Sequence, residues 1–195
     1  MSETLPYLIV GLGNPGREYK ENRHNFGFML VDRLSVRLNA SNMKVQSKAI
    51  TLSTQWEGRK LILAKPQTYM NLSGTSVQGL MHFYKLPLEN LLVAHDDLDL
   101  PFGTIRIRPG GGPGGQKGVE DVINRLGTQD YARLRIGIDR PPGRMDPAHY
   151  VLQDFPSKDL ITLSQVLDRA SDAVQTWVLD GLDSAMNKFN GTVAL

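Results

Sequence analysis

Apolar residues recur along the chain in short runs that are separated by stretches of helical spacing. The runs predict strands at residues 7–12, 49–56, 59–64, 91–95, 104–108 and 134–138. Apolar positions three and four residues apart predict helices after residue 22, at 77–84, at 119–126, and from 157 onward. The Glu57-Gly58 pair predicts a hairpin between two of the strands. This alternation is typical of an α/β layer fold, and the hairpin makes its sheet mixed.

Ligands of such sheets bind beyond the carboxyl ends of the strands. The unusual polar residues of this chain follow Leu12, Ala64, Ala94 and Arg108, where four of the predicted strands end. We therefore expect the functional site to be built from the loops after these four positions.

The composition excludes several kinds of protein. A chain of 195 residues, 41% of them apolar, is long enough for one domain with a buried core. The absence of cysteine excludes a disulfide framework, a thiolate nucleophile and cysteine-bound metals. No apolar run reaches the roughly 20 residues of a membrane helix, and residues 1–4 lack the basic start of a secretory signal. We therefore expect a cytoplasmic protein that does not bind membranes.

Positive charge is concentrated in one part of the chain. The net charge is only +2, yet residues 100–145 hold seven Arg and one Lys against four acidic residues. Such a segment forms either a solvated face or a patch for a phosphate-rich partner. Charge alone leaves both interpretations open.

The sequence Gly-Leu-Gly-Asn-Pro-Gly at 11–16 has the G-x-G-x-x-G spacing of dinucleotide-binding loops. The residues around this segment differ from those around dinucleotide-binding loops. Asp32 lies inside the first predicted helix rather than at the end of a second parallel strand, and Pro15 restricts the loop. A nicotinamide or flavin cofactor is therefore not expected. A tight turn explains the glycines of this segment but does not explain Asn14.

Four blocks of residues stand out at the predicted strand ends. The first block lies within 11–27 and has three parts: Gly-Leu-Gly-Asn-Pro-Gly at 11–16, Tyr19, and Arg-His-Asn-Phe-Gly at 23–27. The other blocks are Lys-Pro-Gln-Thr-Tyr-Met-Asn-Leu-Ser-Gly at 65–74, His-Asp-Asp-Leu-Asp-Leu-Pro-Phe-Gly at 95–103, and Gly-Gly-Gly-Pro-Gly-Gly-Gln-Lys-Gly at 110–118. In their residues, order and spacing, these blocks resemble the bacterial-type peptidyl-tRNA hydrolase family. The resemblance extends over nearly the whole chain.

This resemblance implies a fold and an activity. We expect residues 1–195 to form a single three-layer α/β/α domain with a mixed, mostly parallel twisted sheet and C-terminal helices. The implied enzyme hydrolyses the ester bond between an N-blocked peptide and the 3′ end of tRNA, which recycles peptidyl-tRNA. It acts as a monomer without a cofactor or a metal. The alternative is a non-catalytic RNA-binding relative of the same fold. The presence of His24, Asp96 and Asn14 together favours the enzyme.

His24 and Asp96 have the chemistry of a general base and its partner. An imidazole can accept a proton from water near neutral pH, although the positive potential at a helix start disfavours its charged form. A carboxylate at the end of a strand can orient the imidazole and stabilise the imidazolium. Asp96 is also compatible with a simple turn, or, together with Asp97 and Asp99, with part of a calcium loop, but the other ligands of such a loop are absent. The resemblance makes Asp96 the partner of the catalytic His24.

The resemblance assigns further residues to the substrate. Asn14 and Asn71 carry amides that can bind a peptide or donate to a developing oxyanion; in the family, the match to Asn14 distinguishes N-blocked from free aminoacyl ends. Tyr19 and Tyr69 match positions that line the groove for the tRNA end, where an aromatic face can stack on a base. Met70 contributes an apolar wall. Because the chain has neither a G-x-S-x-G elbow nor a cysteine, we expect direct attack by water.

The basic residues expected to hold tRNA phosphates are Arg106, Arg108, Lys117 and Arg135. Lys117 lies in a glycine-rich loop that opens the third predicted helix, a position suited to binding a phosphate. Here the chain departs from the family, since many members have His-Asn where this chain has Gln-Lys at 116–117. The ammonium of Lys117 can hold a phosphate, but unlike an asparagine amide it cannot accept a hydrogen bond.

Overall fold

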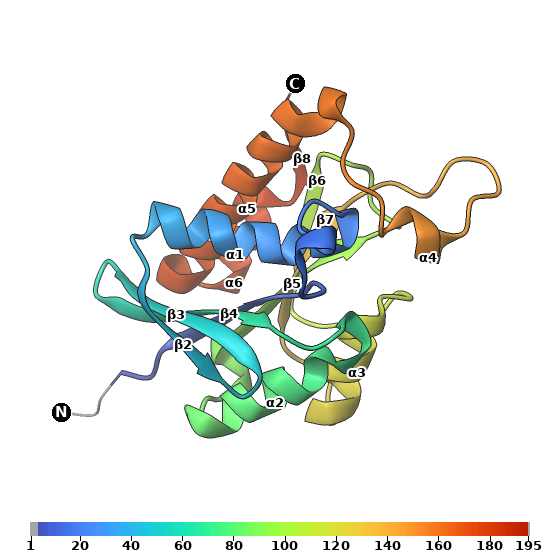
Figure 1. Cartoon of the computed structure of the whole chain (residues 1–195). Helices are drawn as coiled ribbons and strands as arrows, with labels where there is room; N and C mark the ends of the chain where they lie inside the picture. The colour runs from blue at the N-terminus through green and yellow to red at the C-terminus, as the bar shows by residue number, and fades with distance from the viewer. Residues whose placement is uncertain (1–3, 195) are drawn as a thin grey trace.

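One eight-stranded sheet runs through the computed structural model, which describes residues 4–194 (Figure 1). The strand order is β2-β3-β4-β1-β5-β7-β6-β8. The strands are β1 Tyr7–Gly11, β2 Ser41–Gln46, β3 Ala49–Trp56, β4 Arg59–Pro66, β5 Leu91–Asp97, β6 Thr104–Arg108, β7 Ala132–Gly137 and β8 Gly191–Thr192. Only β3 and β6 run against the direction of β1. The predicted mixed, mostly parallel sheet is thus confirmed.

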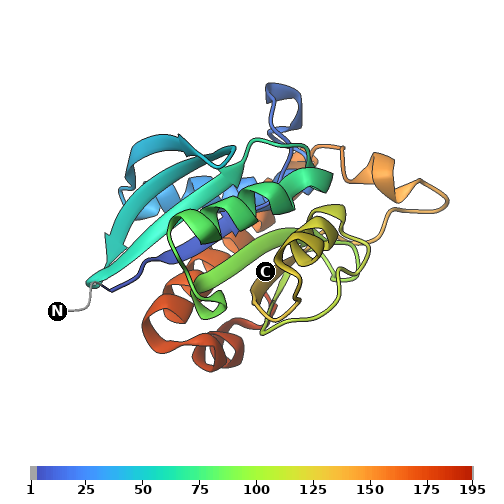
Figure 2. The same cartoon turned by 90° about the horizontal axis from the view of Figure 1, so that it is seen from below.

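Helices cover both faces of the sheet and give the predicted three layers (Figures 1 and 2). One face packs against α1 Phe26–Arg37, α5 Leu160–Asp180 and α6 Leu182–Phe189. The other face packs against α2 Ser73–Phe83 and α3 Lys117–Leu126. The short α4, Pro147–Tyr150, lies on a segment that projects beyond the sheet. No helix among residues 4–194 is both long and apolar enough to cross a membrane.

The elements predicted from the apolar pattern are all present, with small shifts at their ends. The first helix begins only at Phe26, because residues 23–25 form a 3-10 turn, η2 Arg23–Asn25. The segment predicted as helical from residue 157 onward forms two helices, α5 and α6, and the elements that the pattern missed are β2, β8 and α4. The apolar pattern on which the prediction relied is missing from β2, because β2 is an almost wholly exposed edge strand.

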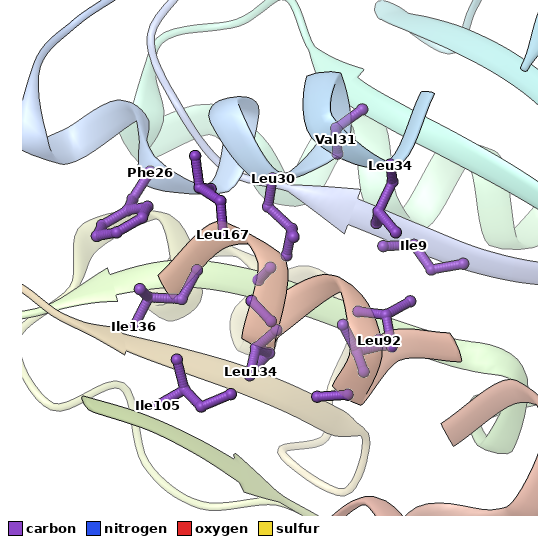
Figure 3. Packing of buried hydrophobic residues seen from close by; sticks show 14 of the residues in the cluster. Ile9, Phe26, Leu30, Val31, Leu34, Leu92, Ile105, Leu134, Ile136 and Leu167 are labelled. Atoms are coloured by element: carbon purple, nitrogen blue, oxygen red, sulfur yellow. The ribbon is translucent and has the colours of Figure 1, made fainter. Parts of the chain in front are cut away.

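The larger core lies between the sheet and the α1–α5 layer. Figure 3 shows Leu30 and Leu34 of α1 directed toward strand residues such as Ile9 and Leu92. All four side chains are fully buried. This packing holds α1 firmly against the central strands.

Two glycines allow α1 to approach the sheet at backbone distance. A Cβ atom at Gly27 would lie 2.4 Å from the nitrogen of Leu12 and 2.5 Å from the carbonyl oxygen of Ala94. A Cβ at Gly11 would lie 2.0 Å from the carbonyl oxygen of Gly27. The first turn of α1 therefore rests directly on the ends of β1 and β5. The turn that precedes it, which carries His24, is placed beside the same strand ends.

Replacing Gly27 with alanine should test this contact. The added methyl would collide with backbone atoms that cannot rotate away, so we expect Gly27→Ala to lower the free energy of unfolding by about 3 kcal/mol or more. Gly112→Ala is the matched control, because a Cβ at Gly112 meets no atom within 4 Å. Urea denaturation of both variants measures the difference. Equal stability of the two variants would contradict the close approach.

Candidate active site

A cleft of about 660 Å³ opens at the carboxyl ends of β1, β4 and β5, three of the four strand ends at which the sequence predicted the functional site. The fourth strand, β6, is antiparallel and ends at the opposite edge, and only residues 114–117 of the loop that follows it line the cleft. Its walls come from the loop after β1, turn η2, turn η3 (Met70–Leu72), the start of α3 and the α4 segment. Seven of the eleven residues predicted for the site line it: Asn14, His24, Tyr69, Met70, Asn71, Asp96 and Lys117. The structure therefore brings together loops that are far apart in the sequence.

His24 and Asp96 form a contact at the floor of the cleft. His24 Nδ1 lies 2.9 Å from Asp96 Oδ2, and their side chains are 14% and 3% exposed. The backbone of His24 is also held, because its N–H donates to the carbonyl of Val151 at 2.8 Å. With Nδ1 bound to the carboxylate, Nε2 is the ring nitrogen left to act in the cleft.

Two opposing effects determine the pKa of His24. Burial of the imidazole lowers the pKa, whereas the charge of Asp96 and its hydrogen bond raise it. The effect of Asp96 prevails, so the pKa of His24 lies above its ordinary value of 6.5. The carboxylate thus compensates for burial of the imidazole and makes His24 a stronger base.

The amide of Asn14 is fixed by its neighbours. Asn25 clamps the main chain of Asn14: its Oδ1 accepts from the Asn14 N–H, and its Nδ2 donates to the Asn14 carbonyl, both at 2.9 Å. The side-chain Oδ1 of Asn14 accepts from the N–H of Met70 at 2.7 Å. The remaining group, Nδ2, is a donor only. The sequence suggested both a donor and an acceptor here, and the fold already pairs the acceptor with the Met70 N–H.

Sequence reasoning missed two residues that hold this arrangement, Asn25 and Gln116. Both are buried, and Gln116 donates to Asp96 Oδ1 at 3.0 Å. Both lie inside blocks that carried the family resemblance, so their position in the sequence already indicated that they belong near the site. What the sequence could not supply was the partner of each side chain.

The four other predicted residues do not line the cleft. Tyr19 is half-buried in turn η1 (Arg17–Tyr19), whereas Arg106 and Arg108 are exposed on β6. Arg135 lies on β7 and donates from Nε to Asp97 Oδ2 at 2.7 Å. Arg135 is linked to the cleft through Asp97, whereas Arg108 lies beside the start of β7, toward the opposite edge of the sheet.

Four arginines point to the same side of β6 and β7, and we define them as the basic face: Arg106, Arg108, Arg133 and Arg135. Arg133 is buried, and the other three are exposed or half-buried. Arg106 is the cross-strand partner of Arg135, and Arg108 of Arg133. Like charges placed opposite each other destabilise a sheet unless something offsets them. Arg133 binds the carbonyls of Gly112 and Gln129, while Arg106 and Arg108 form no ion pair with any residue in 4–194. An anionic partner would offset the charge of these two arginines.

The basic face adjoins the cleft through Asp97, which lines the cleft and binds Arg135. Lys117 stands at the rim of the cleft with its ammonium 3.3 Å from Glu120, and its side chain is 69% exposed. The helix start beside it is partly occupied, because the N–H of Val119 already donates to Gln116. A phosphate at this point would therefore meet Lys117 rather than a fully open helix end.

The acidic residues after β5 do not assemble into a calcium loop. Asp97 binds Arg135 and accepts from the N–H of Asp99 at 2.8 Å, and Asp99 pairs with Arg140. No cluster of three potential metal ligands occurs within residues 4–194.

Comparison with known proteins gives consistent matches. The family model described as Peptidyl-tRNA hydrolase matches residues 8–194. The peptidyl-tRNA hydrolase of Frankia casuarinae is 45% identical over 185 residues, covering 95% of this chain and 94% of the relative. That of Rhodococcus jostii is 47% identical over 184 residues, covering 94% and 97%. The crystal structure of peptidyl-tRNA hydrolase from Acinetobacter baumannii has a TM-score of 0.90 and 36% identity, and the match covers 98% of each chain.

The pKa of His24 should respond directly to Asp96. Asp96→Asn keeps the shape of the side chain but removes its charge, so that burial acts almost alone on the imidazole. We expect the pKa of His24 to fall from above 6.5 to below 6.5, as measured by NMR titration of the histidine ring signals. Asp99→Asn removes a nearby charge that does not touch His24 and should leave its pKa nearly unchanged. Similar pKa values in the two variants would contradict this account of the shift.

Proposed function

The chain belongs to the peptidyl-tRNA hydrolase family, and we propose that its cleft uses His24 as the general base for attack by water. Membership makes the protein an ester hydrolase of peptidyl-tRNA. The observation that carries the proposed mechanism is the His24–Asp96 contact of 2.9 Å inside the cleft. A non-catalytic RNA-binding relative would have no need for this buried pair.

In the proposed reaction, Nε2 of His24 takes a proton from a water molecule as the water oxygen bonds to the ester carbonyl carbon. Asp96 stabilises the imidazolium that forms. The tetrahedral intermediate then collapses, the bond to the ribose 3′ oxygen breaks, and the imidazolium returns its proton to that oxygen. Direct attack is favoured because no Ser, Thr or Cys is among the described residues that line the cleft.

We infer that Asn14 and Asn71 bind the substrate near the scissile bond. The free Nδ2 group of Asn14 can donate to a carbonyl of the peptide or to the developing oxyanion. A free aminoacyl end offers a cationic amine, which presents only donors and cannot accept from this group. Asn71, Tyr69 and Met70 all lie on one wall, with Tyr69 62% exposed and able to meet a base of the tRNA end.

We propose that tRNA phosphates lie along the basic face and beside Lys117. Arg106 and Arg108 are exposed and without acidic partners in residues 4–194, which suits them to phosphate. Arg135 would contact phosphate at the edge where Asp97 joins the basic face to the cleft. Tyr19 would stack on a base outside the cleft.

Other features of the protein follow from the same proposal. It acts as a monomer and as a single domain, in agreement with the one sheet that joins Tyr7 to Thr192. Its reaction requires a base and water, and we propose no metal or organic cofactor. Its substrate is a product of translation, so we place the enzyme in the cytoplasm.

Two variants should separate the chemistry from tRNA binding. His24→Ala removes the base, so we expect kcat to fall about 10²–10⁴-fold while tRNA affinity and its salt dependence stay unchanged. An Arg106→Ala/Arg108→Ala double variant should instead keep kcat, raise KM and reduce the dependence of binding on salt. Turnover of peptidyl-tRNA and binding at several salt concentrations measure both effects. Substantial turnover by His24→Ala would refute the role of His24 as the general base. An unchanged salt dependence of binding in the double variant would refute the proposal that Arg106 and Arg108 bind tRNA phosphates.

Asn14→Asp should weaken the preference for N-blocked substrates. One carboxylate oxygen can still accept from the N–H of Met70, while the other replaces the donor and attracts a cationic amine. We expect the ratio of rates on N-acetyl-aminoacyl-tRNA and aminoacyl-tRNA to fall. Asn124→Asp, an equal charge change on the exposed surface of α3, is the control. An unchanged ratio in Asn14→Asp would show that another group selects the substrate.

A further inference from the structure

Gln116 joins the N-terminus of α3 to the carboxylate that holds His24. Its Oε1 accepts from the Val119 N–H at 2.8 Å and thereby caps the helix. Its Nε2 donates to Asp96 Oδ1 at 3.0 Å. The chemistry of the partners determines this orientation of the amide, because an N–H requires the oxygen and a carboxylate requires the nitrogen.

The carboxylate of Asp96 therefore has a different side chain on each oxygen. His24 binds Oδ2 and Gln116 binds Oδ1. Asp96 and Gln116 are only 2% and 8% exposed, so water has little access to either group. Two donors on opposite oxygens fix the plane of a carboxylate, whereas one donor leaves it free to rotate. We propose that Gln116 is a positioning residue that keeps Asp96 aligned with His24 during hydrolysis.

The packing around Gln116 leaves it little freedom to move away. Its Nε2 also lies 3.2 Å from the sulfur of Met70, so both amide hydrogens have acceptors. Gly118 allows this close packing, since a Cβ there would lie 2.5 Å from the Met70 sulfur and 3.0 Å from Gln116 Oε1. The first turn of α3 is thus seated against Met70, with the amide of Gln116 directed at Asp96.

No other described side chain has a hydrogen bond to the Asp96 carboxylate besides His24 and Gln116. His95 bonds through Nδ1 to the Asp96 main-chain carbonyl at 2.8 Å, and burial keeps its pKa below the ordinary value, so it donates there as a neutral ring. Asp97 is directed to Arg135, and Lys117 to Glu120. The alignment of Asp96 with His24 therefore depends on an amide that carries no charge at any pH.

The adjacent residues Gln116 and Lys117 thus have separate roles, one inside the cleft floor and the other at its rim. This inference rests on the proposed function of His24, and it adds the requirement that the Asp96 carboxylate is held in a fixed orientation. As the imidazole gains a proton, the carboxylate must stay in line with Nδ1 to stabilise the new charge. Gln116 meets that requirement from a segment 20 residues along the chain from Asp96.

Two substitutions at Gln116 and one control separate positioning from helix capping. Gln116→Ser retains a good N-cap but is too short to reach Asp96. Gln116→Glu retains the acceptor and the length, but replaces the donor with a negative charge. Gln78→Ser is the matched control, because Gln78 donates to the carbonyl of Arg125 at 2.7 Å and so anchors the other end of α3.

We expect kcat on peptidyl-tRNA to fall on the order of tenfold in Gln116→Ser, with KM unchanged, as for partial loss of a hydrogen bond to a charged group. In Gln116→Glu, kcat should also fall, and the acidic limb of kcat/KM should move to higher pH, because the added charge raises the pKa of His24. Gln78→Ser should keep native kcat. Circular dichroism confirms that all three variants are folded.

Full kcat in Gln116→Ser would show that Gln116 only caps α3, and an unmoved acidic limb in Gln116→Glu would show that its side chain does not face Asp96. Equal losses in Gln116→Ser and Gln78→Ser would attribute the effect to a loosened helix. Each of these results overturns the proposal. Failure of the proposed function is distinguishable, because His24→Ala would then retain activity whatever the behaviour of the Gln116 variants.

Discussion

The buried carboxylate of Asp96 is the group around which the cleft is organised. An isolated charge is costly to remove from water, so a buried anion requires donors at close range. Here the donors come from opposite sides, one from the turn before α1 and the other from the start of α3. Removing either side chain would leave part of the charge unsatisfied. The positions of the two helix starts are thereby linked to the requirements of one side chain.

Glycines make these contacts possible. At Gly27 and Gly118 the helix backbones approach their neighbours more closely than any side chain would allow. Gly27 lies on the ends of β1 and β5, and Gly118 faces Met70. Of the three glycines that resembled a dinucleotide loop, Gly11 has a similar use, since it provides space for the carbonyl of Gly27. The other two have different uses, since Gly13 packs against the ring of Phe28 and Gly16 has a φ of 120°.

Adjacent carboxylates at the end of β5 face different partners. Successive side chains of a strand point to opposite faces of the sheet. Asp96 consequently meets His24 beside α1, while Asp97 meets Arg135 on the opposite face. The reaction centre and the proposed tRNA surface are thus only one residue apart along the chain. The strand separates them without an additional structural element.

The sequence by itself determined the strands and helices with a buried face, because burial on one side imposes a period that can be counted. It also determined that the loops after β1, β4 and β5 meet, since the carboxyl ends of parallel strands share an edge, and His24, Asp96 and Asn14 were found from this rule and the matching blocks. The rule failed for β6, which is antiparallel and ends at the opposite edge. Exposed elements such as β2 carry no such period and were missed. Only the tertiary structure decided that the Asn14 amide oxygen binds the Met70 N–H and that Gln116 reaches Asp96. The physical reason is that a polar side chain acquires its role from the partner it meets, and that partner lies far away in the sequence.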